Sequence, residues 1–261
     1  MGTGGIVTEG YVGEIFNSVQ GEGFYVGRRQ VFVRFAGCNW DCIYCDTEEF
    51  RNFRPDTCKI ETTSGARKFK HVRNPMRYTE VLRHVRRLTV PSTHSISLTG
   101  GEPLLAGDFL VGVARACKRS GFTTYLETNG VSSRAMRKVL KYIDVVAMDL
   151  KLPEHQAAPR SGWRRLFEEG LTCVRLALKK GVNTFVKIVI LPSTRPRTVS
   201  HVSKHLAKLE VPVVLQPVTP ARKVYDAPSM TYVCRLAKTA AKAGVGEIAI
   251  IPQVHKLIGV L

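Results

Sequence analysis

The sequence predicts an α/β protein built on a mostly parallel β-sheet that is either open or curled into a barrel. Short runs rich in β-branched residues alternate with segments whose apolar residues recur at helical spacing. Several of the helical segments are followed by glycine, which is typical of a helix C-terminus. Such alternation is typical of βα units, in which functional residues lie at the carboxyl ends of the strands.

The predicted strands are short apolar runs bounded by turn residues. In chain order they are Val31–Phe35, Ser95–Thr99, Thr123–Glu127, Val145–Asp149, Thr184–Ile190, Val213–Gln216 and Glu247–Ile251. The predicted helices between them are longer and amphipathic. In chain order they are Thr79–Leu88, Asp108–Arg119, Ser133–Tyr142, Trp163–Lys179, Val199–Leu209 and Met230–Ala243. Residues Arg51 to Pro75 follow neither pattern, and we expect them to form a long loop-like excursion.

We expect residues 1–261 to form a single domain with a basic insertion at about 51–75, because no linker or low-complexity block divides the chain. No run approaches the roughly 18 apolar residues of a membrane span. Met1 to Gly5 form a glycine-rich start rather than a basic and then apolar leader. With free thiols, these features predict a cytoplasmic protein with no membrane partner.

The formal net charge of +18 is concentrated in one stretch. Residues 51 to 87 contain 11 Lys and Arg residues against three acidic ones, Asp56, Glu61 and Glu80. Such a patch can hold RNA phosphates or steer an anionic substrate. Aromatic residues are not interleaved with the charges as they are in single-strand binders. A solvated basic face is therefore favoured over direct nucleic-acid binding.

Three of the seven cysteines have the spacing Cys38-x3-Cys42-x2-Cys45, directly after a predicted strand. Structural zinc requires four protein ligands, whereas a cubic iron–sulfur cluster held by three thiolates keeps one iron open to a small molecule. A zinc site completed by a distant histidine remains an alternative, although His71, 26 residues beyond Cys45, does not fit a usual zinc finger. The other four cysteines are expected to be small buried hydrophobic residues: Cys58, Cys117, Cys173 and Cys234.

Polar motifs follow four of the predicted strands. They are Leu98-Thr99-Gly100-Gly101-Glu102-Pro103, Glu127-Thr128-Asn129-Gly130, Asp149-Leu150-Lys151 and Gln216-Pro217. Each by itself could be an ordinary turn or helix cap, although the two glycines of the first would let the backbone approach a ligand closely. The carboxyl ends of parallel strands share one rim, so all four are expected beside the cysteine loop. This arrangement indicates a catalytic site.

The cysteine motif, with Tyr44 before its third cysteine, and the GGEP turn at Gly100 to Pro103 resemble the radical S-adenosylmethionine superfamily. The resemblance implies that Cys38, Cys42 and Cys45 bind three irons of a [4Fe–4S] cluster, with S-adenosylmethionine chelating the fourth. In that superfamily the sulfonium is cleaved to a 5′-deoxyadenosyl radical that takes a hydrogen atom from the substrate.

Further segments resemble the 7-carboxy-7-deazaguanine synthase family. They are Glu14 to Gly23, Val33 to Asn39, Cys45-Asp46-Thr47 and Pro252 to Lys256. The family is a lyase family that converts 6-carboxy-5,6,7,8-tetrahydropterin to 7-carboxy-7-deazaguanine with loss of ammonia, on the route to preQ0 and to queuosine and archaeosine in tRNA. The resemblance implies a partial β/α barrel, a homodimer, Mg²⁺ beside the cluster, and a flavodoxin- or ferredoxin-like electron donor.

The resemblance also implies a role for individual residues. Those expected to contact the pterin are Val19, Gln20, Gly21, Glu22, Arg34, Thr99, His255 and the terminal carboxylate of Leu261. Arg34 would bind the substrate carboxylate, a planar pairing that lysine reproduces poorly. Those expected to hold S-adenosylmethionine are Tyr44, Asp46, Gly101, Asp149, Leu150, Lys151 and Gln216. Thr47 would place its hydroxyl on Mg²⁺.

Two other functions stay open at this point. The chain has Asp149 where the family commonly has a serine, and Asp149-Leu150-Lys151 also resembles the glycyl-radical-enzyme activases. Such an activase acts on a protein loop, which would leave Val19 to Gly23 and Thr47 without a role. A non-enzymatic RNA-binding zinc module would explain the charge, but not the polar strand ends. His255 could equally be a packed, hydrogen-bonded histidine.

Overall fold

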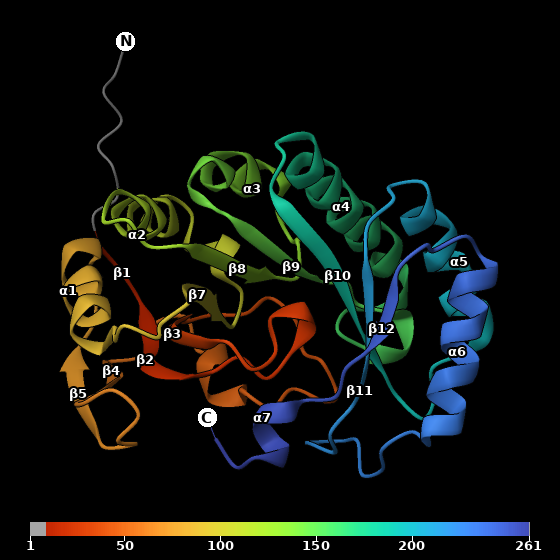
Figure 1. Cartoon of the computed structure of the whole chain (residues 1–261), viewed down its shortest axis with the longest axis horizontal. Coiled ribbons are helices and arrows are strands. Elements are labelled where there is room, and N and C mark those ends of the chain that lie inside the picture. The colour runs from red at the N-terminus through yellow and green to blue at the C-terminus, as the bar shows by residue number, and fades with distance from the viewer. Residues whose placement is uncertain (1–8, 261) are drawn as a thin grey trace.

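A computed structural model describes residues 9–260, in which ten strands form one curved sheet (Figure 1). Their order across the sheet is β12-β11-β10-β9-β8-β7-β3-β2-β4-β5. The strands are β2 (Val12–Val19), β3 (Arg29–Phe35), β4 (Thr57–Glu61), β5 (Phe69–Arg73), β7 (Ser95–Gly100), β8 (Thr124–Thr128), β9 (Val145–Asp149), β10 (Asn183–Ile190), β11 (Val213–Pro217) and β12 (Ile248–Ile250). A separate antiparallel pair is formed by β1 (Glu9–Gly10) and β6 (Met76–Arg77).

The strands predicted from the sequence are the parallel part of this sheet. From β3 through β7, β8, β9, β10 and β11 to β12, every neighbouring pair is parallel. The sheet does not close, because β12 and β5 are its two ends. The predicted mostly parallel α/β fold is therefore confirmed, in its open form.

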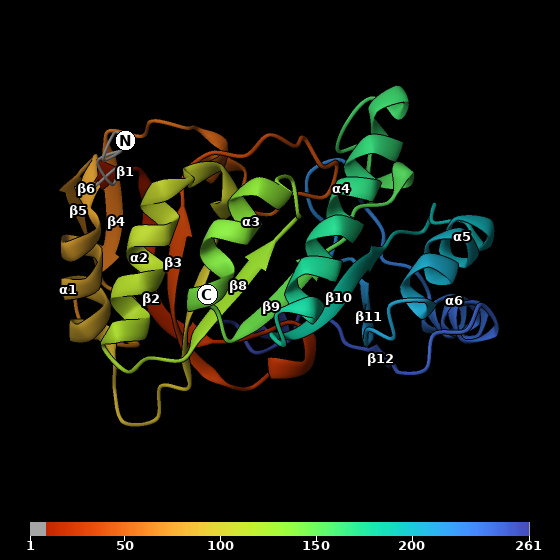
Figure 2. The same cartoon turned by 90° about the horizontal axis from the view of Figure 1, so that it is seen from above.

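The six longer helices cover the outer face of the curved sheet (Figure 1). Seen from above, α2, α3 and α4 lie side by side over the central strands (Figure 2). The helices are α1 (Tyr78–Leu88), α2 (Asp108–Arg119), α3 (Ser133–Val139), α4 (Arg160–Lys179), α5 (Pro196–Ala207), α6 (Met230–Lys242) and α7 (Val254–Leu257). Each of the six longer helices agrees with a predicted segment, although Leu140–Tyr142 is a 3₁₀ turn rather than the end of α3.

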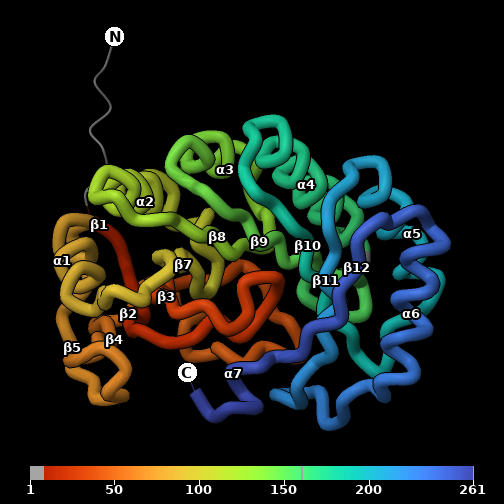
Figure 3. The backbone as a smooth tube through the Cα atoms, in the orientation of Figure 1, coloured from red at the N-terminus to blue at the C-terminus, as the bar shows by residue number. Residues whose placement is uncertain are grey.

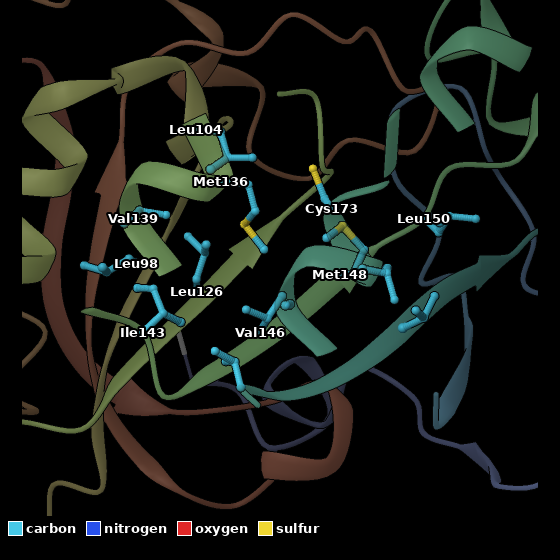
Figure 4. Close-up of a cluster of buried hydrophobic side chains, with 14 of the residues drawn as sticks. Leu98, Leu104, Leu126, Met136, Val139, Ile143, Val146, Met148, Leu150 and Cys173 are labelled. Atoms are coloured by element: carbon cyan, nitrogen blue, oxygen red, sulfur yellow. The ribbon is translucent and has the colours of Figure 1, made fainter. Parts of the chain in front are cut away.

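The main hydrophobic core lies between the outer helices and the sheet. In Figure 4, Leu98, Leu126 and Val146 of neighbouring strands point toward Met136 and Val139 of α3. Burying each such side chain contributes about 1.5–3 kcal/mol. Because the outer face is apolar and closed by helices, polar side chains on the sheet can gather only on the opposite, concave face.

The structure corrects two expectations drawn from local pattern. Residues 57–73 are not a loop, since β4 and β5 form an antiparallel hairpin that extends the sheet beyond β2. Cys58 lies buried in this hairpin, as expected, but Cys234 is exposed on α6 and is not part of the core. The hairpin forms because β4 pairs with β2, a contact between residues more than forty positions apart that local pattern does not reveal.

The last part of the chain returns to its beginning. The tube in Figure 3 shows the segment after β12 running beside the N-terminal strands, and the amide of Val254 donates to the carbonyl of Gly21 at 2.9 Å. This contact brings α7 over the concave face of the sheet. In the described part of the chain, no helix combines the length and hydrophobicity needed to span a membrane.

Candidate active site

A cavity opens on the concave face, at the carboxyl ends of the parallel strands. All three clustered cysteines line it, together with residues from the ends of β2, β3, β7, β8, β9 and β11 and from α7. The segments that the sequence placed along one rim therefore do meet in space.

The two glycines of the GGEP turn let β7 pack against the start of the cysteine loop. A Cβ on Gly100 or Gly101 would overlap the backbone of Phe35 or Gly37, respectively. The backbone also bonds there, because Glu102 N–H donates to the Gly37 carbonyl at 2.8 Å. These glycines thus allow two protein backbones to approach each other, and both also line the cavity.

The cysteine loop is held on its other side by the segment after β9. The amides of Asp41 and Ile43 donate to the carbonyls of Ala157 and His155 at 3.1 and 3.2 Å. In addition, the Arg222 guanidinium donates to the carbonyl of Cys42 at 2.8 Å. With its backbone fixed at several points, the loop presents its thiols to the cavity without a disulfide.

The three thiols are close enough to influence one another. Burial, opposed by the charge of Lys151 and assisted by Asp149, Cys38 and Cys45, raises the pKa of Cys42 to about 11. Burial also raises the pKa of Cys38. Thiolates in such a place need compensating positive charge, which a bound iron cluster supplies. Among residues 9–260, no three His, Cys, Asp or Glu side chains are arranged to hold one single metal ion.

Lys151, just after β9, joins the cysteine loop to Asp149. Its ammonium lies 2.8 Å from Asp149 Oδ2 and donates to the Tyr44 hydroxyl at 3.0 Å. Burial opposes ionisation of Asp149, but the charges of Lys151 and Lys187 outweigh it and lower its pKa to about 2. The pair is therefore ionised at neutral pH, and the charges face the cavity beside the thiols.

A second buried ammonium lies deeper in the cavity. Lys187 of β10 is 4% exposed and lies 2.8 Å from Glu127 Oε1 and 3.5 Å from Asp149 Oδ2. It also forms an ion pair with Glu22. Burial by itself would lower the pKa of Lys187, but the three carboxylates raise it well above its usual value.

The turn after β2 forms the opposite wall. Gln20 is buried, its amide donates to Gln30 at 3.1 Å, and its side-chain oxygen accepts from the Glu22 amide at 3.0 Å. The carboxylate of Glu22 in turn accepts a hydrogen bond of 2.7 Å from Gln253. Gln20 therefore shapes this turn, and Glu22 is the residue whose charge reaches the cavity.

Arg34 and His255 complete this wall. The Arg34 guanidinium lies over the rings of Phe16 and Phe50. Its buried Nε lies 3.5 Å from Glu14 Oε2 in an ion pair but makes no hydrogen bond within the described residues. A Cβ on Gly21 would overlap the ring of His255, so only glycine lets α7 come this close. Burial lowers the pKa of His255, so that its ring is neutral at neutral pH.

Glu102 has a structural role. Its carboxylate accepts from Leu104 N at 2.9 Å, Thr128 Oγ1 at 2.5 Å and Asn129 N at 2.7 Å, and it is 1% exposed. Burial raises its pKa to about 7 despite these donors. This carboxylate joins the ends of β7 and β8, while Thr99 keeps its hydroxyl at the cavity and donates to Glu127 at 3.2 Å.

The cavity contains acceptor atoms that the protein itself does not satisfy. Asn129 Oδ1, Asp149 Oδ1 and Gln216 Oε1 are buried without a hydrogen-bond partner in the described chain. Leaving a buried acceptor unpaired costs about 1–3 kcal/mol, which favours a ligand rich in hydroxyl and amino donors. Three thiols on one side and three open acceptors on the other fit an iron–sulfur cluster with S-adenosylmethionine.

The structure brings together nearly all residues selected from the sequence. Those that line the cavity are Val19, Gln20, Gly21, Glu22, Arg34, Cys38, Cys42, Tyr44, Cys45, Asp46, Thr47, Thr99, Gly101, Asp149, Lys151, Gln216 and His255. Leu150 does not, because its side chain alternates to the opposite face of the sheet and packs in the core (Figure 4). Leu261 lies outside the described residues.

Sequence reasoning missed Lys187 and Trp40 among the lining residues, and it assigned no role to Gln253 within the segment Pro252 to Lys256. Glu127 and Asn129 lie within a strand-end motif that had been noticed but not assigned a role. The one signal for Lys187 in the sequence was a single charge inside an otherwise apolar strand. Because lysine is almost never buried without a partner, such a position indicates that acidic residues elsewhere in the chain lie next to it.

Comparisons with known proteins agree with this geometry. The radical SAM superfamily profile matches residues 32–204. The 7-carboxy-7-deazaguanine synthase of Geobacter sulfurreducens is 36% identical over 95% of this chain and 96% of its own, and that of Methanothermobacter thermautotrophicus is 32% identical over 94% and 96%.

Solved structures share the fold at lower identity. QueE from Escherichia coli has a TM-score of 0.59 at 18% identity over 93% of each chain. A radical SAM methyltransferase from Sphaerobacter thermophilus has a TM-score of 0.62 at 16% identity over 88% of this chain and 67% of its own. The thiols, the rim of polar strand ends and the relatives over nearly the whole length together show that the chain belongs to the 7-carboxy-7-deazaguanine synthase family of radical SAM enzymes.

Proposed function

We propose that this chain catalyses the radical ring contraction of 6-carboxy-5,6,7,8-tetrahydropterin to 7-carboxy-7-deazaguanine, with release of ammonia, in 7-deazapurine biosynthesis. The observation that carries the proposal is a single cavity with the cysteine loop at one side and Glu22, Arg34 and His255 at the other. When bound, the cluster and S-adenosylmethionine supply the radical that abstracts hydrogen from the substrate. The protein orients both ligands and excludes water.

The cofactor side is formed by Lys151, Asp149 and Gln216. We propose that the Lys151 ammonium binds the carboxylate of S-adenosylmethionine, and that the open acceptors of Asp149 and Gln216 take its hydroxyl or amino groups. The chain's aspartate, in place of the family's serine, keeps an acceptor at this point. We assign Tyr44 a positioning role instead of direct contact with S-adenosylmethionine. Its hydroxyl is hydrogen-bonded to Lys151 and His155 and so holds Lys151 in place.

The substrate side is formed by Glu22, Arg34, Thr99 and His255. We assign the substrate carboxylate to Arg34, whose guanidinium is desolvated by aromatic rings and so favours a planar anion. Glu22 offers a carboxylate to the donor-rich amino and amide edge of the pterin. The neutral ring of His255 can donate or accept one hydrogen bond, and Val19 and Gly21 supply the backbone between them.

We assign Mg²⁺ to the hydroxyl of Thr47. This side chain lines the cavity next to the third cysteine and lies 3.9 Å from its sulfur. A hard cation bound by one protein hydroxyl keeps room for substrate oxygens and water. Thr47→Ala is expected to reduce the stimulation of turnover by Mg²⁺ while leaving cluster assembly intact, and a normal response to Mg²⁺ in this variant contradicts the assignment.

Further proposals concern the assembly. We propose a single domain over 1–261, supported by one sheet that runs through the described chain, and a cytoplasmic location, supported by seven free cysteines. We also propose a homodimer and a flavodoxin- or ferredoxin-like reductant, in keeping with the family and with the basic charge of the chain.

Anaerobic reconstitution followed by turnover tests the function. We expect iron and sulfide near four each per chain, with broad visible absorption, and loss of both in Cys42→Ala. Reduced enzyme with S-adenosylmethionine, Mg²⁺ and the carboxytetrahydropterin should yield 7-carboxy-7-deazaguanine, identified by mass spectrometry. Absence of iron overturns the radical assignment, and cluster without this product overturns the substrate assignment.

A further inference from the structure

Lys187 carries the more deeply buried of the two ammonium groups in the cavity, and three separate segments provide its partners. Glu22 comes from the turn after β2, Glu127 from β8 and Asp149 from the end of β9. Lys187 itself pairs in register with Asp149 across neighbouring strands. No other ammonium in the described part of the chain forms ion pairs with three carboxylates.

Burying such an ammonium costs desolvation free energy, and its ion pairs add little to the stability of the fold. A charged lysine inside a strand is costly unless it is paired, and a buried ion pair is often no more stabilising than apolar packing. Apart from Lys187, β10 is apolar from Phe185 to Ile190, and Phe185, Val186 and Ile188 next to the lysine are buried. A residue that is costly for folding yet satisfied by cavity-lining groups indicates a role in the site.

The three carboxylates divide between the two sides of the cavity. Glu22 is bonded to Gln253 and faces the substrate side, and Glu127 accepts from the Thr99 hydroxyl on the same side. Asp149 belongs to the cofactor side, where Lys151 holds one of its oxygens at 2.8 Å and the other has no partner in the described chain. The one Lys187 ammonium therefore connects both sides.

We propose that Lys187 is a positioning residue that couples the two sides, so that S-adenosylmethionine bound at Asp149 tightens the binding of the pterin at Glu22 and Glu127. The proposal rests on the residue roles assigned above. A hydrogen-bond donor of the ligand at the open oxygen of Asp149 competes with Lys187 for the negative charge of this carboxylate. The ammonium then interacts more strongly with Glu22 and Glu127 and holds them in the orientation that the substrate requires.

Coupling of this kind is reciprocal and can be measured without turnover. The enzyme with an oxidised cluster and no reductant does not cleave S-adenosylmethionine, so both ligands reach equilibrium. The dissociation constant of the carboxytetrahydropterin is measured by anaerobic equilibrium dialysis, with and without saturating S-adenosylmethionine. In wild type we expect the cofactor to tighten pterin binding by about fivefold or more, the lower range of typical coupling between sites.

Lys187→Met keeps most of the length of the side chain and removes its charge. We expect the coupling factor to fall to about one, even where each ligand still binds by itself. The matched control is Lys138→Met, which removes an ammonium paired with Asp108 at 2.7 Å on the outer helices, away from the cavity. This control should keep the wild-type coupling factor.

Lys187→Met leaves buried carboxylates without a counter-ion, so the double variant Lys187→Met with Glu127→Gln is prepared in parallel. Removing one carboxylate should raise the unfolding midpoint above that of the single variant, while the coupling factor stays near one. Wild-type coupling in either Lys187 variant overturns the proposal, as does wild-type enzyme that shows no coupling although it forms 7-carboxy-7-deazaguanine. Wild-type enzyme that forms no such product contradicts the proposed function instead.

Discussion

The hydroxyl of Tyr44 and the ring of His155 lie 3.3 Å apart and join the cysteine loop to the segment after β9. His155 Nε2 lies 2.8 Å from the carbonyl of Val189 and must donate to it, so Nδ1 is an acceptor, shared by the Leu152 N–H at 3.0 Å and the Tyr44 hydroxyl. Tyr44 can then accept from Lys151. A fully buried neutral histidine thus sets the direction of the hydrogen bonds that reach the cofactor side.

The first prediction concerns acid stability. Burial, assisted by the charge of Lys151, lowers the pKa of His155 to about 3. The unfolded chain binds this proton first, so the contribution of the neutral ring is complete above about pH 6.5 and is lost as the pH falls toward 3. Between about pH 6.5 and pH 5, we expect this one group to remove about 2 kcal/mol of unfolding free energy.

Urea unfolding at the two pH values measures this loss. His155→Gln has no proton to gain, so its unfolding free energy should decline by about 2 kcal/mol less than that of wild type. His71→Gln, at an exposed position on β5, is the control and should retain the wild-type decline. An unchanged pH dependence in His155→Gln contradicts the prediction.

The second prediction concerns Glu102. Glu102→Gln places an amide donor opposite at least one of three donors, Leu104 N–H, Thr128 O–H and Asn129 N–H. We expect a loss of about 1–3 kcal/mol in unfolding free energy at neutral pH. The control, Glu247→Gln at an exposed position, should have little effect. Equal stability of the two variants in chemical unfolding shows that Glu102 does not join the strand ends.

The third prediction concerns Gly101. An alanine Cβ would overlap the carbonyl of Gly37, and backbone atoms cannot move aside as a flexible side chain can. Gly101→Ala should displace the cysteine loop and lower the iron bound after reconstitution to less than half the wild-type content. Gly246→Ala meets open space and should bind iron normally. Full iron content in Gly101→Ala rules out this role of the close contact.

The fourth prediction concerns Gly21 and His255. Gly21→Ala should push the His255 ring out of the cavity and raise the KM for the pterin about tenfold, the equivalent of one hydrogen bond of about 1.4 kcal/mol. Binding of S-adenosylmethionine should not change. Because the new Cβ overlaps both the ring and the Cβ of His255, the double variant Gly21→Ala, His255→Gly should be no worse than His255→Gly. If the two substitutions raise the KM for the pterin additively in steady-state kinetics, they do not act through the same displacement of His255.

Local pattern and resemblance predicted much of the site. β9 and α2 have the bounds expected from the sequence, and the thiols and four polar strand ends meet as their positions required. β2 was not predicted as a strand, because buried Glu14 and Asn17 interrupt its apolar pattern. Their partners, Lys59, Leu88 and Glu61, lie far along the chain, so no local signal could show them to be satisfied.

The sequence by itself determined the parallel α/β fold, the cysteine motif and the rim at which it lies, since hydrophobic period and strand-end chemistry are local properties. Only the tertiary structure decided that Gly100 and Gly101 admit the cysteine loop, that Leu150 faces the core, and that Lys187 meets three carboxylates. The physical reason is that close backbone approach and the pairing of a buried charge depend on partners brought together by sheet order and register.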